Sequence, residues 1–189
     1  MRTRLYYLHF TLLLAITVFA ANPVYGANYK AIDLNPSGSS LSYAYGVNGT
    51  QQAGYSNDSA TGGADHALIW NRSSTSYVDL NPSGFSVSYA NKTNGTQQAG
   101  YGHGSATGGN EHALLWSGTA NNYIDLSQFL PTGLTSVCYA NSIDSYGNIV
   151  GSALDSYGNA HAILWEPVPE PCTLLLLGLG AAIVRKKHR

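Results

Sequence analysis

Residues 79–116 read DLNPSGFSVSYANKTNGTQQAGYGHGSATGGNEHALLW, and residues 33–70 read DLNPSGSSLSYAYGVNGTQQAGYSNDSATGGADHALIW. The two stretches agree at 27 of 38 positions without a gap, at a spacing of 46 residues. Self-similarity at a fixed period of this length is typical of a repeat architecture. A diverged third copy follows, in which Asp125-Leu126, Tyr139-Ala140 and residues 161–165 match the same landmarks. We therefore predict a region built by duplication.

The predicted repeat region spans residues 27–166, with units near 29–74, 75–120 and 121–166. Each unit offers four short strand-like segments separated by turn residues. In the first unit these segments are residues 42–47, 51–55, 66–70 and 77–80. The dipeptide Asn48-Gly49 favours a two-residue hairpin in which both residues take positive φ.

The segment 66–70 indicates how the sheets pack. Strand alternation places His66, Leu68 and Trp70 on one face, and the opposite face is also apolar. A strand that is apolar on both faces belongs inside a stack of sheets. Four short strands in about 45 residues are typical of a propeller blade, so the sequence predicts an all-β, propeller-like fold.

The His-Ala-x-x-Trp runs, each with an upstream Gln-Ala-Gly or Ile-Val-Gly, resemble the HAF repeats of extracellular bacterial proteins. That resemblance implies a β-rich, propeller-like repeat domain of unassigned activity. A β-trefoil, which also has three units of four strands, is the alternative. Residues 29–34 correspond to residues 77–80 and 123–126, whereas the third unit stops at Trp165 without such a segment. We therefore expect residues 29–34 to pair with residues 161–165 and to close the repeats into a ring.

Each signature residue of the repeats has a structural interpretation and a chemical one. His66, His112 and His161 could converge on a transition metal, but a histidine at the start of a buried strand more often donates to a backbone carbonyl. The repeat signature that we interpret as structural comprises His66, Trp70, His112, Trp116, His161, Trp165, Asp33, Asp79 and Asp125. No metal and no cofactor are predicted.

Catalytic motifs are missing from the sequence. Asp33, Asp79 and Asp125 precede turns, where aspartate caps backbone amides. The Gly-x-Ser-x-Gly motif is absent, and no serine, histidine and acid share a recognisable spacing. We therefore predict a protein that is not an enzyme.

Charge is unevenly placed along the chain. Six of the nine basic residues lie at the two ends, and all ten acidic residues lie between positions 33 and 170. An acidic middle repels a phosphate backbone. Nucleic acid is therefore excluded as the expected partner.

Residues 1–26 have the three parts of a secretory signal peptide. The first four residues carry two positive charges, Arg2 and Arg4, residues 5–21 are largely apolar, and Val24-Tyr25-Gly26 precedes a cleavage site. The sequence predicts export, with this segment forming a signal helix.

Residues 167–189 form a second targeting segment. Val168-Pro169-Glu170-Pro171 is followed by an apolar run over residues 172–184 and then by a basic cluster that contains Arg185, Lys186, Lys187 and Arg189. This order at the C-terminus resembles the PEP-CTERM sorting signal, a resemblance that covers about the last 22 residues. The resemblance implies processing near Pro169-Glu170-Pro171 by an exosortase, a membrane protease of bacteria that make exopolysaccharide. The apolar run predicts a short transmembrane helix, with the basic cluster on the cytoplasmic side.

Together these features predict an exported protein, first anchored in the membrane and then at the cell surface or in the extracellular matrix. Its repeat domain is expected to be non-catalytic and to bind glycan or another matrix component. Aromatic faces stack on sugar C–H groups and side-chain amides bond hydroxyls, which suits the abundant Tyr and Asn. The alternative is a hydrolase or lyase that acts on the matrix polysaccharide.

Overall fold

The computed structural model of the chain describes residues 29–58 and 62–168. The chain divides into two compact units, Met1–Ala31 and Ile32–Arg189. The expected signal helix, the apolar run and the basic cluster of the tail lie outside the described residues. Among the described residues, no helix is long and apolar enough to cross a membrane.

The described part of the chain is all-β, as the sequence predicts: eleven strands form three antiparallel sheets, and the only helices are two short 3₁₀ turns. Sheet 1 contains β1 (Ser39–Asn48), β2 (Gln51–Asp58), β3 (Asp65–Asn71) and β4 (Tyr77–Asp79). Sheet 2 contains β5 (Phe85–Thr93), β6 (Gln98–Gly104), β7 (His112–Trp116) and β8 (Tyr123–Asp125). Sheet 3 contains β9 (Leu134–Ile143), β10 (Ile149–Asp155) and β11 (Ala160–Trp165). The 3₁₀ turns are η1 (Ser105–Thr107) and η2 (Leu126–Phe129).

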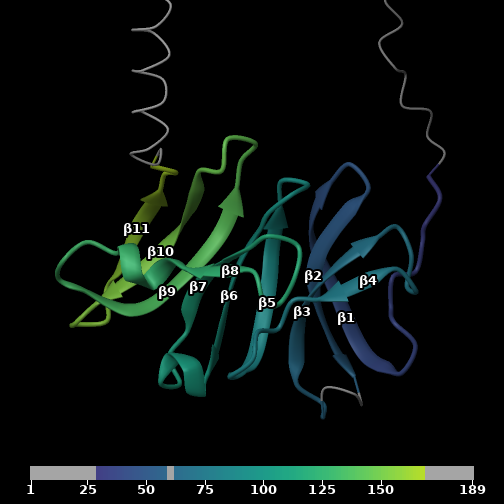
Figure 1. Cartoon of the computed structure of the whole chain (residues 1–189), viewed down its shortest axis with the longest axis horizontal. Helices are drawn as coiled ribbons and strands as arrows, with labels where there is room; N and C mark the ends of the chain where they lie inside the picture. The colour runs from purple at the N-terminus through teal and green to yellow at the C-terminus, as the bar shows by residue number, and fades with distance from the viewer. Residues whose placement is uncertain (1–28, 59–61, 169–189) are drawn as a thin grey trace, which may run out of the picture. The chain divides into compact units, whose positions relative to one another are not determined.

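Each sheet is a meander in which every strand pairs with its neighbour in the chain (Figure 1). The first hairpin of each sheet carries a β-bulge, between Ala44 and Gly46 in β1 and between Ala90 and Lys92 in β5. Sheet 3 has its bulge at the matching point of the β9–β10 pair. A bulge turns an extra side chain to the other face of its strand.

The glycine of each Gln-Ala-Gly or Ile-Val-Gly run has a steric reason. A Cβ on Gly54, Gly100 or Gly151 would lie 1.8 to 1.9 Å from a carbonyl oxygen of the adjacent strand. That distance is well inside van der Waals contact, so only glycine permits the approach.

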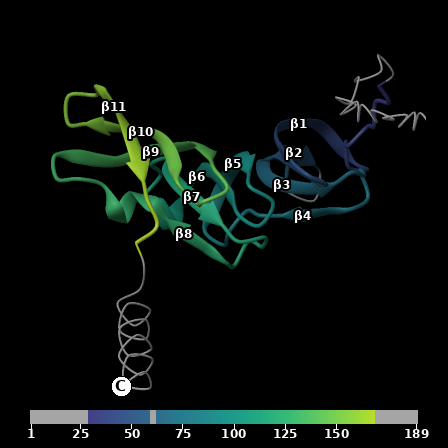
Figure 2. The same ribbon diagram turned by 90° about the horizontal axis from the view of Figure 1, so that it is seen from above.

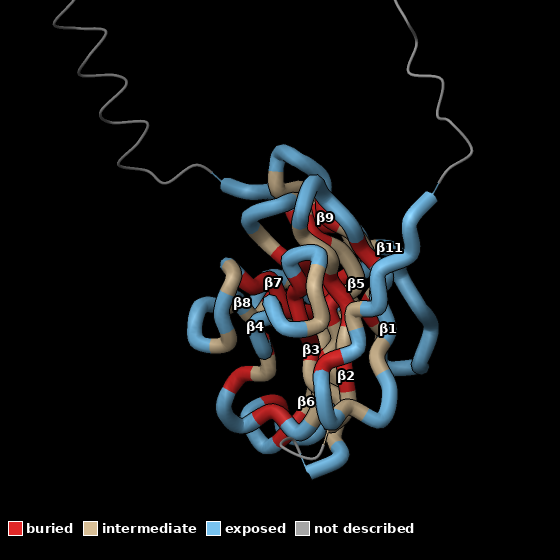
Figure 3. The backbone as a smooth tube through the Cα atoms, turned by 90° about the vertical axis from the view of Figure 1, so that its right-hand side faces the viewer, coloured by how far each residue is buried: buried red, intermediate tan, exposed pale blue. Residues whose placement is uncertain are grey.

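The three sheets pack face to face, with sheet 2 between the other two (Figures 1 and 2). One core joins Ala53, Ala67 and Ile69 of sheet 1 to a set of sheet 2 residues: Phe85, Ala90, Leu114 and Trp116. A second core joins the corresponding residues of sheet 2 to sheet 3: Ala99, Ala113, Leu115, Cys138, Ala140, Ile149 and Trp165. Buried residues concentrate in the inner strands of the stack, whereas β1, β4 and β11 are largely exposed (Figure 3).

The expected ring closure is wrong. Residues 29–36 form no strand, β11 pairs only with β10 among the described residues, and the described sheets are not closed. Because stacked sheets lie about 10 Å apart, sheet 2 separates the edges that the N-terminal segment would have to join. A closed β-trefoil barrel is absent from the described residues for the same reason.

The expected hairpin at Asn48-Gly49 also differs. Asn48 ends β1 opposite Gln51, so Gly49 and Thr50 are the central residues of the turn. Only Gly49, with φ of 56°, takes a positive value. The asparagine therefore extends the strand and the glycine alone provides the turn.

Candidate functional site

The histidines of the repeat signature are paired with aspartates of their own sheet. His66 Nδ1 lies 2.8 Å from Asp79 Oδ2, and His112 Nδ1 lies 2.7 Å from Asp125 Oδ2. The expected partner was a backbone carbonyl, so the structure corrects this point. A carboxylate holds a histidine in one orientation more strongly than a neutral carbonyl does.

The same aspartates also organise the turns that follow them. Oδ1 of Asp33, Asp79 and Asp125 accepts the backbone N–H two residues further on, at 2.7 to 2.9 Å. The carboxylate thus fixes a turn with one oxygen and offers the other to a histidine.

The tryptophans of the signature lie inside the sheet stack. Trp70, Trp116 and Trp165 are at most 7% exposed, and Trp165 Nε1 donates to the Leu126 carbonyl at 3.1 Å. Neither the tryptophans nor the His–Asp pairs form a shared centre. Within residues 29–58 and 62–168, no group of three or more His, Cys, Asp or Glu could hold a metal ion.

Six tyrosines form a continuous row across the three sheets, in which each aromatic ring contacts the next. We call this set the tyrosine ladder: Tyr45, Tyr43, Tyr55, Tyr89, Tyr101 and Tyr139. Successive ring centroids lie 4.8 to 6.3 Å apart. Within a sheet the successive contacts are stacked and the additional Tyr45–Tyr55 contact is tilted, whereas contacts between sheets are edge to face. Both geometries are favourable for aromatic pairs.

The ladder is partly buried from Tyr55 to Tyr139 and open at its start. Tyr43 is 50% exposed and Tyr45, the extra residue of the β1 bulge, is 56% exposed. Tyr89 donates its hydroxyl to Asp65 Oδ2 at 2.9 Å. Burial first, and then a hydrogen bond with Tyr45, raise the pKa of Tyr55 to about 12. Tyr55 therefore keeps a neutral hydroxyl group at physiological pH.

Two turns of identical sequence were not predicted as functional features. The pentapeptide Asp-Ser-Tyr-Gly-Asn occurs at residues 144–148 and again at 155–159, on either side of β10. In each turn the aspartate accepts the backbone N–H groups of the tyrosine and the asparagine at 2.8 to 2.9 Å. Tyr146 and Tyr157 are 84% and 89% exposed. The repeated pentapeptide is itself the signal that could have identified these displayed rings.

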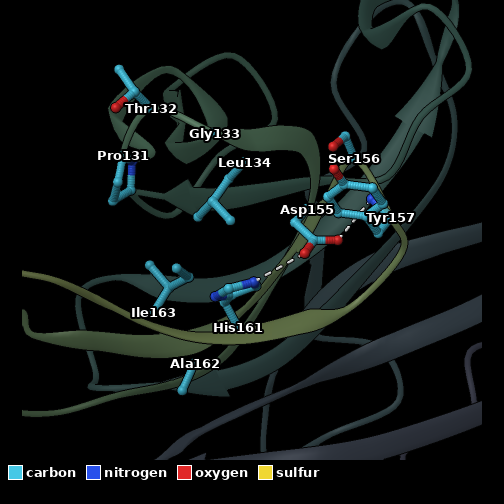
Figure 4. Close-up of a pocket in the computed structure, with 10 residues that line it drawn as sticks. All are labelled: Pro131, Thr132, Gly133, Leu134, Asp155, Ser156, Tyr157, His161, Ala162 and Ile163. Atoms are coloured by element: carbon cyan, nitrogen blue, oxygen red, sulfur yellow. Dashed lines mark hydrogen bonds and ion pairs between the residues drawn. The ribbon is translucent and has the colours of Figure 1, made fainter.

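The second of these turns borders a shallow pocket of about 440 Å³ (Figure 4). Asp155 and Tyr157 line it from the turn, His161 from β11, Pro131 from the connection after η2 and Leu134 from the start of β9. His161 Nε2 lies 3.5 Å from Asp155 Oδ2, and the histidine side chain is 51% exposed. Hydrogen bonds from Asn159, first from its side chain, lower the pKa of Asp155 to about 2. The pocket therefore pairs an exposed histidine with a carboxylate that is ionised at physiological pH.

Of the sorting residues, only Val168 lies within the described part of the chain, where it is 86% exposed. Pro169, Glu170, Pro171 and the basic cluster lie outside the described residues. Comparison with protein-family models, with curated proteins and with solved structures returned no significant match.

Proposed function

We propose that this chain is an exported, exosortase-sorted surface or matrix protein whose β-sheet region binds extracellular polysaccharide without catalysing a reaction. The observation that carries the binding role is the tyrosine ladder, because its two outermost rings are half exposed on a sheet surface. The sorting role rests on the sequence of residues 167–189.

The ladder suits a sugar polymer physically. Each aromatic ring offers a flat apolar face to sugar C–H groups, and its hydroxyl offers a donor and an acceptor. Tyr43 and Tyr45 are stacked at 6.3 Å with an interplanar angle of 12°, so the two rings form a platform. Their contacts with Tyr55 restrain the rings before a ligand arrives, which lowers the entropy cost of binding.

We also infer that the three sheets are copies of one four-stranded unit and form part of a propeller-like array. The matching bulges support this inference, as do the equivalent glycines, the His–Asp pairs of sheets 1 and 2 and the two similar cores. One hydrogen bond between sheets is also made twice. The Ala67 N–H donates to Ser88 Oγ at 3.0 Å, and the Ala113 N–H donates to Cys138 Sγ at 3.2 Å.

Binding of the chain to soluble bacterial exopolysaccharide tests the proposal. We expect Tyr45→Ala to weaken binding by about 2- to 10-fold, since an aromatic contact contributes about 0.5–1.5 kcal/mol beyond its buried area. Tyr77→Ala is the matched control, because Tyr77 is 41% exposed but lies outside the ladder. Equal binding by the wild type and Tyr45→Ala contradicts the ladder as the site. New reducing or unsaturated ends in the polysaccharide would instead support the hydrolase or lyase alternative.

A further inference from the structure

Among the described residues, sheet 3 lacks the strand that completes the other two sheets. β4 pairs with β3 and β8 pairs with β7, whereas β11 forms the edge of its sheet (Figure 1). In sheet 1, the residue that follows β4 makes a further backbone hydrogen bond to β3, from the Leu80 N–H to the Ala67 carbonyl at 2.8 Å. The corresponding carbonyl of β11 belongs to Ala162. An uncovered edge of this kind is a template for another strand.

His161 lacks the carboxylate that its two counterparts have. His66 and His112 contact the aspartate that ends the fourth strand of their sheet, at 2.8 and 2.7 Å. The carboxylate near His161 is that of Asp155, which lies 3.5 Å away and ends β10, the preceding strand. The open pocket of Figure 4 lies beside His161, where that fourth strand would end.

The chain carries the missing segment elsewhere. Ile32-Asp33-Leu34 corresponds to Val78-Asp79-Leu80 and to residues 124–126. Asp33 Oδ1 already accepts the Asn35 N–H at 2.9 Å, as Asp79 Oδ1 does with Asn81. In the two complete sheets the other oxygen, Oδ2, contacts the histidine. Ile32 is 49% exposed and belongs to no strand.

The interface between neighbouring sheets occurs twice in the chain, between sheets 1 and 2 and between sheets 2 and 3. The outer faces of sheets 1 and 3 correspond to the two sides of that interface, but neither has a neighbouring sheet. On sheet 3, Val150 is 49% and Leu164 is 55% exposed, whereas their counterparts in sheets 1 and 2 are covered by the next sheet: Ala53, Ile69, Ala99 and Leu115.

On sheet 1, Ala44 is exposed and Val47 is 61% exposed, while Trp70 of the same face is already buried. The counterparts of Ala44 and Val47 in β5 and β9 are at most 4% exposed: Ala90, Thr93, Ala140 and Ile143.

We propose that two copies of the chain associate head to tail. Residues 32–34 of one copy form the fourth strand on β11 of the second copy, Asp33 accepts a hydrogen bond from His161, and sheet 1 packs on the outer face of sheet 3. Two such contacts join six sheets into a ring, which lies within the four to eight blades usual for propellers. Each of the two contacts joins different surfaces, sheet 1 of one copy and sheet 3 of the other, and a two-fold axis relates the two contacts.

The mass of the full chain in a mild detergent, measured by sedimentation equilibrium, tests the association. We expect twice the chain mass for the wild type, and a single chain mass for Ala44→Lys and for Leu164→Lys. Ile124→Lys is the matched control, since Ile124 is 47% exposed but belongs to the middle sheet, and it should remain dimeric. These side chains are exposed, so a cooperative urea transition will show that each variant folds, with a lower midpoint expected for the two monomeric variants because association stabilises the wild type.

Mixing the two monomeric variants distinguishes a contact between sheet 1 and sheet 3 from a contact between two copies of the same sheet. In an equimolar mixture, Leu164→Lys has an intact outer face on sheet 1 and Ala44→Lys has an intact outer face on sheet 3. We therefore expect a dimer that contains one copy of each. A wild type that stays monomeric overturns the proposal. So does a mixture that stays monomeric, or a dimer that either single variant leaves intact.

The strand pairing has its own test. Because Val78 pairs with Ile69 in sheet 1, Ile32 of one copy should lie opposite Leu164 of the other. The chain that carries both Ile32→Cys and Leu164→Cys should therefore form a covalent dimer on mild oxidation, since paired β-strand positions approach closely enough for a disulfide. Ile32→Cys combined with Ile124→Cys should not. Equal cross-linking of both pairs would contradict the register.

Discussion

His66, His112 and His161 occupy equivalent strand positions but differ in their surroundings. Their side chains are 18%, 12% and 51% exposed, and only the first two have a short contact with a carboxylate. An exposed ion pair contributes little to stability because water competes for both partners, whereas a buried group that loses its partner is costly. The residue type alone therefore does not determine the role; burial does.

The effect of His112→Ala follows from this difference. The substitution removes the partner of Asp125 Oδ2 and also the contact between Ser127 Oγ and His112 Nδ1. We expect the free energy of unfolding to fall by about 1–3 kcal/mol. Urea unfolding followed by tryptophan fluorescence measures it. His161→Ala is the control and should cost less, because its histidine is half exposed; equal losses would contradict the argument.

Gly100 gives a second prediction at the residue scale. A Cβ there would lie 1.9 Å from the Tyr89 carbonyl oxygen, and only a backbone shift can relieve that overlap. We expect Gly100→Ala to prevent folding into the native sheet, measured by the loss of the cooperative urea transition. Gly118→Ala is the control: its φ of 80° strains an alanine, but no atom lies within 4 Å of the added Cβ. That strain costs about 1–2 kcal/mol, so Gly118→Ala should still fold.

At the scale of strands and turns, the sequence allows the strand centres to be predicted but not the contacts between sheets. Residues 51–55 and 66–70 lie within β2 and β3, because alternation and turn residues are local signals. The tyrosine ladder could not be predicted in this way. Tyr55 meets Tyr89 only because sheet 2 packs on sheet 1 in one register, and local sequence signals do not contain that register.

The ladder makes stability depend on pH in the alkaline range. Burial is the largest cause that raises the pKa values of Tyr55, Tyr89, Tyr101 and Tyr139. Tyr55 moves from 10.0 to about 12. A folded-state pKa above the unfolded value means that the contribution is fully present below pH 10.0 and is lost as the pH rises through about 12.

We therefore expect the urea midpoint to fall between pH 10.0 and about 12, together with a rise in tyrosinate absorbance. Tyr89→Phe removes one partly buried hydroxyl, which donates to Asp65, and should make the pH dependence shallower. Tyr146→Phe, whose ring is 84% exposed, should leave it unchanged. A midpoint that stays constant over this range would contradict the contribution of the ladder hydroxyls to stability.

At the scale of the whole molecule, the number of sheets follows from the sequence but their closure does not. The 46-residue period and the third set of landmarks indicate three units, and three sheets are present. The expected ring assumed that segments 29–34 and 161–165 meet within one chain. The stacking of the sheets sets the distance between these two segments. The number of strands contains no information about the angle between successive sheets. Matching edges therefore remain at the two ends of the stack.

The last prediction concerns the tail, which we propose acts independently of the sheets. Residues 165–189, fused to a soluble reporter, should direct it to membranes in a host that has an exosortase and should lose their basic end there. From the sequence alone, we expect the two prolines that flank Glu170 to favour an extended recognition segment before the apolar run. Changing Pro169, Glu170 and Pro171 to alanine should abolish the processing, measured as the mass of the reporter. The control changes Trp165 and Glu166 to alanine, which leaves the motif intact and should be processed normally. Equal processing of the altered motif and the control would reject the sorting role, and loss of processing only in the altered motif would support it.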